Sequence, residues 1–317
     1  MTFPVFDLHC DTALALVSKS KDSGESLLKN SGHIDLQRGQ KLPGYCQCFA
    51  CFTTTWDKLP GGITVETLFE REMGIVLSQF DAYPDMIRQA FCAQDVKDNY
   101  ENGLMSGILT IEGPAGFGFD PALLEDLYKV GFRISTLGWN EKNPLTGSNV
   151  TGGGLTDRGR EYVKEAQRLG MIIDVSHISD EGFWDIMGIT QKPIIATHSN
   201  SRAVWGHSRN LTDDMFRAIC ESDGVSGLNL YSEFIGESAD LDAACDHIFH
   251  FLEIDPAGKH IALGGDLDGC EELPDGFTGV ESYPLLAQRL LDRGLDEKIV
   301  HRIYWDNALE VLEKCSM

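Results

Sequence analysis

The stretch VFDLHCDTAL (residues 5–14) contains an apolar, strand-like run that ends in two side chains able to bind a metal. Side chains alternate between the two faces of an extended chain, so His9 and Asp11, two residues apart, point to the same side. A neutral imidazole and a carboxylate aimed at one point can hold a divalent cation. The pair alone also fits an ordinary strand end with a hydrogen-bonded histidine and a solvated aspartate. Whether the pair binds a metal therefore depends on how the other strands end.

Four further apolar runs end in the same way. ILTIEG, IIDVSH, IIATHS and LGGDLDG end in or near Glu112, His177, His198, and the pair Asp266 and Asp268. One such strand end would be unremarkable. Five in one ordered series are hard to explain by core packing, because buried charged groups must be paired or bind a metal.

The rest of the chain alternates strand patterns with amphipathic helical patterns. Strands are expected at 5–9, 45–52, 107–113, 132–139, 171–177, 193–199, 224–230 and 260–269. Helices are expected at 63–83, 121–131, 157–170, 212–224, 241–254, 280–294 and 296–314. This alternation predicts an α/β fold with a parallel sheet. Eight strands favour a single (β/α)8 TIM barrel domain over residues 1–317; an open doubly wound sheet would call for a glycine-rich loop after the first strand, which HCDTALA is not.

The composition bounds the class of protein. A net charge of −23 would repel phosphate backbones and anionic lipid surfaces, so neither nucleic acid nor a membrane is an expected partner. No apolar run approaches membrane-spanning length, and the N-terminus lacks the pattern of an export signal. The nine cysteines fit reduced thiols, and therefore a cytoplasmic location.

The segment YCQCFACF (residues 45–52) holds a C-x-x-C spacing, Cys48 and Cys51, with Cys46 nearby. A zinc or redox site is one interpretation. No second Cys/His pair lies close in sequence, and free cysteine packs as a small hydrophobe. The sequence therefore favours a buried strand here.

In a barrel, the carboxyl ends of the strands meet at one mouth, where active sites are built. Three histidines and two or three carboxylates suit zinc or another divalent first-row metal, and exceed one open tetrahedral site. Two metals about 3.5–4 Å apart would bind and deprotonate a water, with Glu112 as a candidate bridge and Asp266 free to move protons. Arg202 or Arg209 could grip a substrate carboxylate, and spacing does not choose between them. The remaining histidines are expected to be structural or exposed: His33, His207, His247, His250, His260 and His301.

These motifs, in this order, resemble the membrane dipeptidase (renal dipeptidase) family, peptidase family M19. The matching stretches are DLHCDT, GHIDLQR, TIEG, LGWN, DVSHIS, THSNSRAV, SRNLTDD and GGDLDG, and they span nearly the whole chain. The resemblance implies a TIM barrel of the metal-dependent hydrolase type that holds two zinc ions. It also allows a homodimer, since relatives are commonly dimeric.

The resemblance implies a role for each matching residue. His9 and Asp11 correspond to ligands of one zinc, His177 and His198 to ligands of the second, and Glu112 to the bridge. Arg209 corresponds to the residue that binds the substrate carboxylate, and Asp266 to the catalytic acid that contacts the substrate. Trp139 stands where the mammalian enzymes have a substrate-contacting histidine, and an indole N–H can donate a hydrogen bond but cannot become cationic.

The expected activity is hydrolysis of dipeptides, including those with a C-terminal D-residue, by a metal-bridging hydroxide. A related metal-dependent amidohydrolase acting on a lactam, a cyclic peptide or another small amide is the alternative. A non-catalytic metal-binding scaffold is a third hypothesis. The complete series of strand-end residues argues against it, because an inactive relative would be free to lose some of them.

Overall fold

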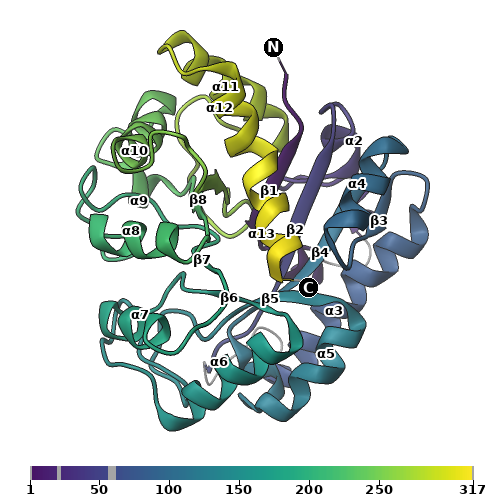
Figure 1. Ribbon diagram of the computed structural model, residues 1–317. Coiled ribbons are helices and arrows are strands. Elements are labelled where there is room, and N and C mark those ends of the chain that lie inside the picture. The colour runs from purple at the N-terminus through teal and green to yellow at the C-terminus, as the bar shows by residue number, and fades with distance from the viewer. Residues whose placement is uncertain (1, 20–22, 56–61, 316–317) are drawn as a thin grey trace.

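The computed structural model describes residues 2–19, 23–55 and 62–315, and its main sheet curls into a nearly closed barrel of eight parallel strands (Figure 1). The strands are β1 (Val5–Cys10), β2 (Tyr45–Phe52), β4 (Met105–Glu112), β5 (Phe132–Thr136), β6 (Ile172–Asp174), β7 (Ile194–Ile195), β8 (Ser226–Leu228) and β9 (Ile261–Leu263). Their spatial order is β7-β6-β5-β4-β2-β1-β9-β8. The ring closes through a parallel bridge between Ala196 and Ser226, just beyond β7. The predicted TIM barrel is confirmed.

Several strands are shorter than predicted, because polar side chains at their carboxyl ends redirect the backbone. The run predicted at 171–177 ends as a strand at Asp174, whose carboxylate accepts a hydrogen bond from the backbone N–H of Ser176 at 2.9 Å. The runs predicted at 132–139, 193–199 and 260–269 also leave the sheet early, at Thr136, Ile195 and Leu263. The residues that follow form the mouth of the barrel.

The sequence analysis missed a ninth strand, β3 (Ile87–Gln89), which pairs with the first residues of β4 at Met105–Gly107. β5 pairs with β4 only from Leu109 onward, so β3 occupies the part of β4 that β5 does not reach. Three residues give too short a period for an alternating pattern to be visible in the sequence.

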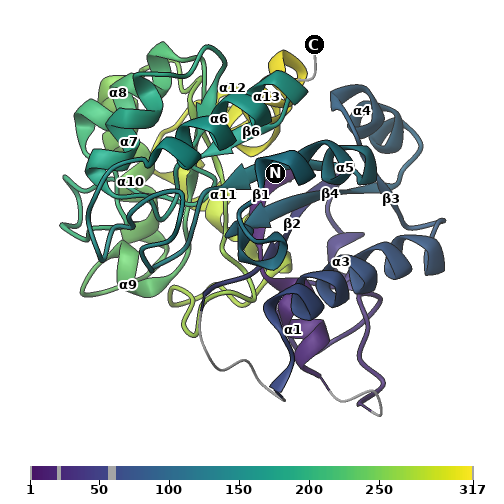
Figure 2. The ribbon, with the colours of Figure 1, turned by 90° about the horizontal axis from the view of Figure 1, so that it is seen from below.

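Helices surround the ring of strands (Figure 2). They are α1 (Thr12–Ser18), α2 (Leu36–Gly39), α3 (Val65–Ala82), α4 (Ala93–Glu101), α5 (Leu124–Val130), α6 (Asp157–Leu169), α7 (Asp180–Met187), α8 (Asp213–Glu221), α9 (Ser232–Ile235), α10 (Leu241–Ile254), α11 (Tyr283–Asp292), α12 (Glu297–His301) and α13 (Asn307–Cys315). The helix predicted at 296–314 is interrupted by a π-helical turn at Arg302–Asp306. Thr156 and Thr212 cap α6 and α8, because their side chains accept backbone N–H groups of the first helical turn.

The amino-terminal end of the barrel is filled by apolar side chains and covered by α13, which crosses the ring of strands in Figure 1. Inward-facing residues such as Phe6 and Ile108 form one cluster with Trp305 and with residues of α13. The carbonyl of Cys315, at the end of α13, accepts a bond from the Lys192 ammonium just before β7. This end of the barrel is therefore a packed apolar base.

The cysteines of β2 are core residues. Cys46 and Cys48 belong to the inner cluster and Cys51 to the outer layer between strands and helices, so the C-x-x-C thiols lie on opposite faces of the sheet. Burial raises the pKa of all three thiols well above its usual value. The preference for a buried strand is confirmed. No helix in the described ranges is long and apolar enough to cross a lipid bilayer.

Candidate active site

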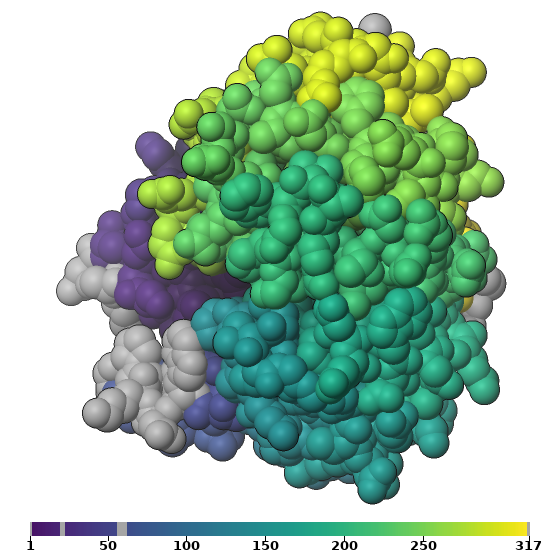
Figure 3. All heavy atoms as spheres, turned by 90° about the vertical axis from the view of Figure 1, so that its left-hand side faces the viewer, coloured from purple at the N-terminus to yellow at the C-terminus, as the bar shows by residue number. Residues whose placement is uncertain are grey.

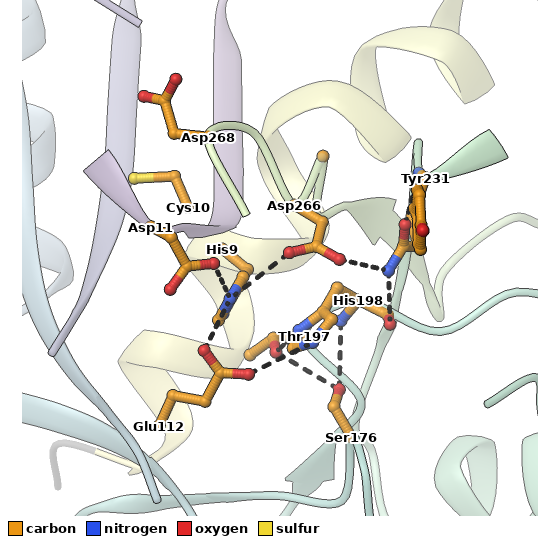
Figure 4. A network of polar contacts seen from close by, with 12 residues as sticks. His9, Cys10, Asp11, Glu112, Ser176, Thr197, His198, Tyr231, Asp266 and Asp268 are labelled. Atoms are coloured by element: carbon orange, nitrogen blue, oxygen red, sulfur yellow. Dashed lines mark hydrogen bonds and ion pairs between the residues drawn. The ribbon is translucent and has the colours of Figure 1, made fainter. Parts of the chain in front are cut away.

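At the carboxyl-terminal mouth of the barrel, the imidazole of His9 points into a group of carboxylates (Figure 4). Its Nε2 is 3.3 Å from Glu112 Oε2, 3.4 Å from Asp11 Oδ2 and 3.7 Å from Asp266 Oδ1. His9 follows β1's apolar run, Glu112 ends β4, and Asp266 follows β9. Residues more than 250 positions apart therefore meet at one point, as the strand-end series predicts.

The other oxygen of Glu112 faces the two remaining histidines. Glu112 Oε1 is 3.0 Å from His177 Nε2 and 3.9 Å from His198 Nε2, and the two Nε2 atoms are 3.0 Å apart. The rings of His9 and His198 stack with their centres 3.8 Å apart. Glu112 thus lies between two groups of side chains, with one carboxylate oxygen toward each.

The chemistry of these atoms fits bound metal. His9 Nε2, Asp11 Oδ1 and Glu112 Oε2 are buried and have no hydrogen-bond partner among the described residues. Such atoms cost free energy unless something else satisfies them. Two overlapping sets have donor atoms close enough to share an ion: His9, Glu112 and His198, and His9, Asp11 and Asp266. Asp266, expected from the sequence to carry protons, therefore also belongs to the second of these sets.

Hydrogen bonds to the Nδ1 atoms of His177 and His198 determine which ring nitrogen faces the group of metal-binding side chains. His177 Nδ1 lies 2.9 Å from Asn140 Oδ1, and His198 Nδ1 lies 2.7 Å from Thr197 Oγ1. The Thr197 hydroxyl donates to Asp174 Oδ2 at 2.5 Å, so Thr197 Oγ1 accepts the Nδ1–H of His198. Each Nδ1 therefore carries the proton, and each Nε2 offers a lone pair to the centre.

The sequence analysis missed these three positioning residues. A signal exists for each: Asp174 is a charge within an apolar run, Thr197 precedes His198, and Asn140 follows Trp139 in LGWN. Asp7 is another buried carboxylate beside the site, and its Oδ1 accepts the backbone N–H groups of His9 and Gly265, both at 3.0 Å. Asp7 thereby ties β1 to the segment after β9.

The site groups differ in protonation. Burial lowers the pKa of His177 and His198 well below the usual value, which keeps both rings neutral. Burial alone would also lower the pKa of His9, but the carboxylates of Glu112 and Asp11 outweigh it and raise that pKa well above its usual value. Burial raises the pKa of Glu112 to about 8. Metal binding would therefore displace protons from His9 and Glu112.

One oxygen of the Asp266 carboxylate is fixed by a hydrogen bond. Its Oδ2 accepts a hydrogen bond from Asn229 Nδ2 at 3.0 Å, while Oδ1 faces His9. Asp266 and His177 both adopt positive φ, at 55° and 68°, in the left-handed region that is costly for residues other than glycine. Gly269 packs so closely that a Cβ there would overlap the carboxylates of Asp11 and Asp266.

A cavity of about 570 Å³ opens above these groups. Figure 3 shows a recess on this side of the molecule, where purple, teal and green parts of the surface meet. Besides the central groups, the lining includes Leu14, Phe52, Trp139, Asn149, Val150, His207, Tyr231, Glu233, Phe234 and Glu271. The expectation that His207 is merely structural or exposed is therefore incomplete, because it lies in the cavity wall.

The structure distinguishes the two arginines that the spacing left open. Arg202 forms a two-pronged ion pair with Asp180 at 2.7 and 2.8 Å. Arg209 is 4% exposed, lines the cavity and donates to Ser199 Oγ and the His198 carbonyl, both at 3.2 Å. Its Nε has no hydrogen-bond partner among the described residues. Arg209 is thus the arginine placed to meet a ligand in the cavity.

Trp139 also lines the cavity. Its ring centre is 5.2 Å from that of Phe52 and 6.1 Å from that of His177. The indole therefore borders both the cavity and one histidine of the centre. A barrel mouth with this donor set and this cavity defines a metal-dependent hydrolase.

Comparison with known proteins narrows the class. Residues 1–317 match the model of the membrane dipeptidases, peptidase family M19. An uncharacterized dipeptidase of Schizosaccharomyces pombe is 34% identical over 332 residues, covering 98% of this chain and 80% of that protein. A dipeptidase of Aspergillus oryzae is 31% identical, covering 76% of this chain and 60% of that protein.

A solved structure agrees with this match. The crystal structure of a metallopeptidase from Rhodobacter sphaeroides, liganded with a phosphinate mimic of the dipeptide L-Ala-D-Ala, is 28% identical to the chain. The two folds align with a TM-score of 0.88 over 99% of this chain and 100% of that one. The chain belongs to the membrane dipeptidase family, peptidase family M19, and is a metallopeptidase.

Proposed function

We propose that the protein is a binuclear zinc dipeptidase whose substrates include dipeptides with a C-terminal D-residue. The observation that carries the proposal is the placement of Glu112 between two groups, with His9 Nε2 3.3 Å from one oxygen and His177 Nε2 3.0 Å from the other. The proposed ligands are His9 and Asp11 for one zinc, His177 and His198 for the second, and Glu112 for both. The D-residue is supported by the Rhodobacter relative, whose bound ligand mimics L-Ala-D-Ala.

The protein's own side chains would handle the proton. The chemistry supplied by bound zinc is activation of a water molecule and polarisation of the peptide carbonyl. Asp266 takes the proton of the attacking water through Oδ1 and passes it to the leaving amine. Asn229 holds Oδ2 of the same carboxylate, so the oxygen that moves the proton stays turned toward the centre.

Two further residues would position the substrate. Arg209 binds the C-terminal carboxylate through charge-assisted hydrogen bonds, and its fixed place beside the centre restricts the substrate to short peptides. Trp139 contacts the substrate from another part of the cavity lining. Its indole can donate one hydrogen bond but cannot supply a positive charge to the transition state.

The test uses chelator-treated protein, reloaded with zinc and assayed on a panel of L,L and L,D dipeptides. Activity should depend on the metal and include members of the L,D set. Arg209→Met should lower kcat/KM by about 10²-fold or more, since a buried charge-assisted pair is lost. The control Arg217→Met, on the exposed face of α8, should have no effect. Zinc-loaded protein that cleaves no dipeptide of the panel would contradict the proposal.

A further inference from the structure

One wall of the cavity combines aromatic rings with carboxylates. The segment around α9 contributes Tyr231, Glu233 and Phe234, and the loop after β9 contributes Glu271. The rings of Tyr231 and Phe234 meet edge to face with centres 4.9 Å apart. Burial, together with a hydrogen bond to the Glu271 carboxylate, raises the pKa of Tyr231. These four residues form one continuous surface, here called the acidic wall.

The position of Arg209 indicates which part of a bound substrate would face the acidic wall. Its guanidinium carbon is 5.3 Å from the centre of the Phe234 ring. The side chain is almost fully buried, and its Nε lacks a partner among the described residues, so Arg209 is prepared to bind an anion. A C-terminal carboxylate held there would bring the side chain of the same residue beside Phe234 and its neighbour Glu233.

The charges that line the cavity are strongly one-sided. Arg209 is the only lysine or arginine among the described residues of the lining. Asp268 is satisfied internally, by the Thr12 hydroxyl at 2.7 Å and the His33 backbone N–H at 2.5 Å. Glu233 and Glu271 are exposed at the mouth, and no described lysine or arginine forms an ion pair with either. Their charges are therefore not neutralised by a described lysine or arginine, and the Tyr231 hydroxyl that contacts Glu271 carries no charge to cancel it.

We propose that the acidic wall selects dipeptides whose C-terminal residue carries a cationic side chain, an inference that rests on the proposed dipeptidase function. The methylene stem of a lysine or arginine would lie along the rings of Phe234 and Tyr231. Its charged end would pair with Glu233 and Glu271, and aromatic faces also attract cations. An anionic side chain would meet both carboxylates and be repelled, and the net charge of −23 opposes its approach.

The experiment compares three substrates, L-Ala-Lys, L-Ala-Met and L-Ala-Glu, in whichever C-terminal configuration the zinc-loaded enzyme accepts for L-Ala-Ala. Methionine provides an uncharged side chain of comparable length. The expected order of kcat/KM is Lys, Met, Glu, with a Lys-to-Glu ratio of about tenfold or more at low salt. Added salt should reduce the ratio, because exposed charges are screened.

Variants assign the preference to the acidic wall. Glu233→Gln and Glu271→Gln should each lower the ratio of kcat/KM for L-Ala-Lys to that for L-Ala-Met by about two- to fivefold. Glu233→Lys should reverse the order of Lys and Glu. The matched control is Glu237→Gln, an exposed residue of the same segment that does not line the cavity, and it should change no ratio.

The outcomes separate the two proposals. If the enzyme cleaves L-Ala-Ala and L-Ala-Met but its Lys-to-Glu ratio is near one, or is unmoved by Glu233→Lys, the acidic wall is not selective and the inference is overturned. The dipeptidase function would then stand. If no dipeptide is cleaved at all, the proposed function fails and this inference falls with it.

Discussion

Ile108 and Glu112 lie on the same inward face of β4, four residues apart, and both are almost fully buried. Ile108 packs into the apolar cluster that α13 covers, whereas Glu112 ends among histidines and carboxylates. The two side chains are therefore similarly hidden from water but differ in what surrounds them. Burial stabilises the base, because apolar area is removed from water there.

At the mouth, the same burial opposes stability. His9 Nε2, Asp11 Oδ1 and Glu112 Oε2 have no hydrogen-bond partner among the described residues, and each buried group left without a hydrogen bond costs about 1–3 kcal/mol. The stabilisation from the apolar base therefore offsets the cost of these polar atoms at the mouth. A bound cation would remove that cost by accepting their lone pairs. The difference implies that changes at the mouth alter metal binding and activity, while changes at the base alter stability.

The largest effect is expected from Glu112→Gln, which replaces the carboxylate that faces both groups with a neutral amide. The rate of dipeptide hydrolysis should fall by about 10³-fold or more, because the amide cannot balance two cations. Metal content by mass spectrometry should fall below two ions per chain. The metal-free variant should be no less stable than the wild type at pH 7, since a costly buried carboxyl group is gone. Full activity with two bound ions would contradict the bridging role.

Metal affinity should rise steeply with pH. Protons on His9, whose pKa is raised by Glu112 and Asp11 against the effect of burial, and on Glu112, whose pKa is raised by burial to about 8, compete with the cation. Displacing one such proton increases the apparent affinity by about tenfold per pH unit, so about 100-fold between pH 6 and pH 8. Zinc competition titrations at the two pH values measure this.

The metal-free protein should respond to pH in the opposite direction. Above about pH 7, where His177 and His198 are largely neutral even when unfolded, the raised folded pKa values of His9 and Glu112 mean that the folded state binds more protons and loses stability as pH rises from about 7 to 8. Melting temperatures in chelator should fall over this range. A zinc affinity that is independent of pH would show that neither group is a ligand.

A smaller effect is expected from the residues that position His198 by hydrogen bonds. Asp174→Asn weakens the Thr197 link that fixes the tautomer of His198, and should lower zinc affinity by about 10- to 100-fold. Thr197→Ser keeps the hydroxyl and should stay close to wild type. Equal losses in both variants would indicate a packing effect instead of control of the imidazole.

The smallest effect is expected at the base. Ile108→Val removes one methylene from the apolar cluster and should lower the free energy of unfolding by about 0.5–1.5 kcal/mol. Zinc content and kcat at 25 °C should be unchanged. Denaturant titrations with and without zinc provide the measurement, and a loss of metal in this variant would break the separation between base and mouth.

The sequence predicts much of this comparison, because apolar runs with polar ends are visible without a structure. The residues of the centre are predicted as a set, since strand ends in a parallel barrel must converge. β3 is not predicted, because it is too short to show a period, and the early ends of β6, β7 and β9 depend on polar contacts after the strands.

Contacts between distant segments are the part that the sequence could not supply. Spacing alone could not separate Arg209 from Arg202, because the difference depends on Asp180, the first residue of α7, which pairs with Arg202. The place of His207 in the cavity wall depends likewise on how loops pack. The sequence shows the chemistry of each side chain, but the fold determines which residue that side chain contacts.

The central claim is that the mouth of this barrel holds two cations on either side of Glu112. Anomalous diffraction from zinc-grown crystals, recorded at the zinc absorption edge, tests it most directly. The account predicts two peaks, one beside His9 and Asp11 and one beside His177 and His198, each next to a different oxygen of Glu112. A zinc-replete crystal with no peak among these residues would contradict it.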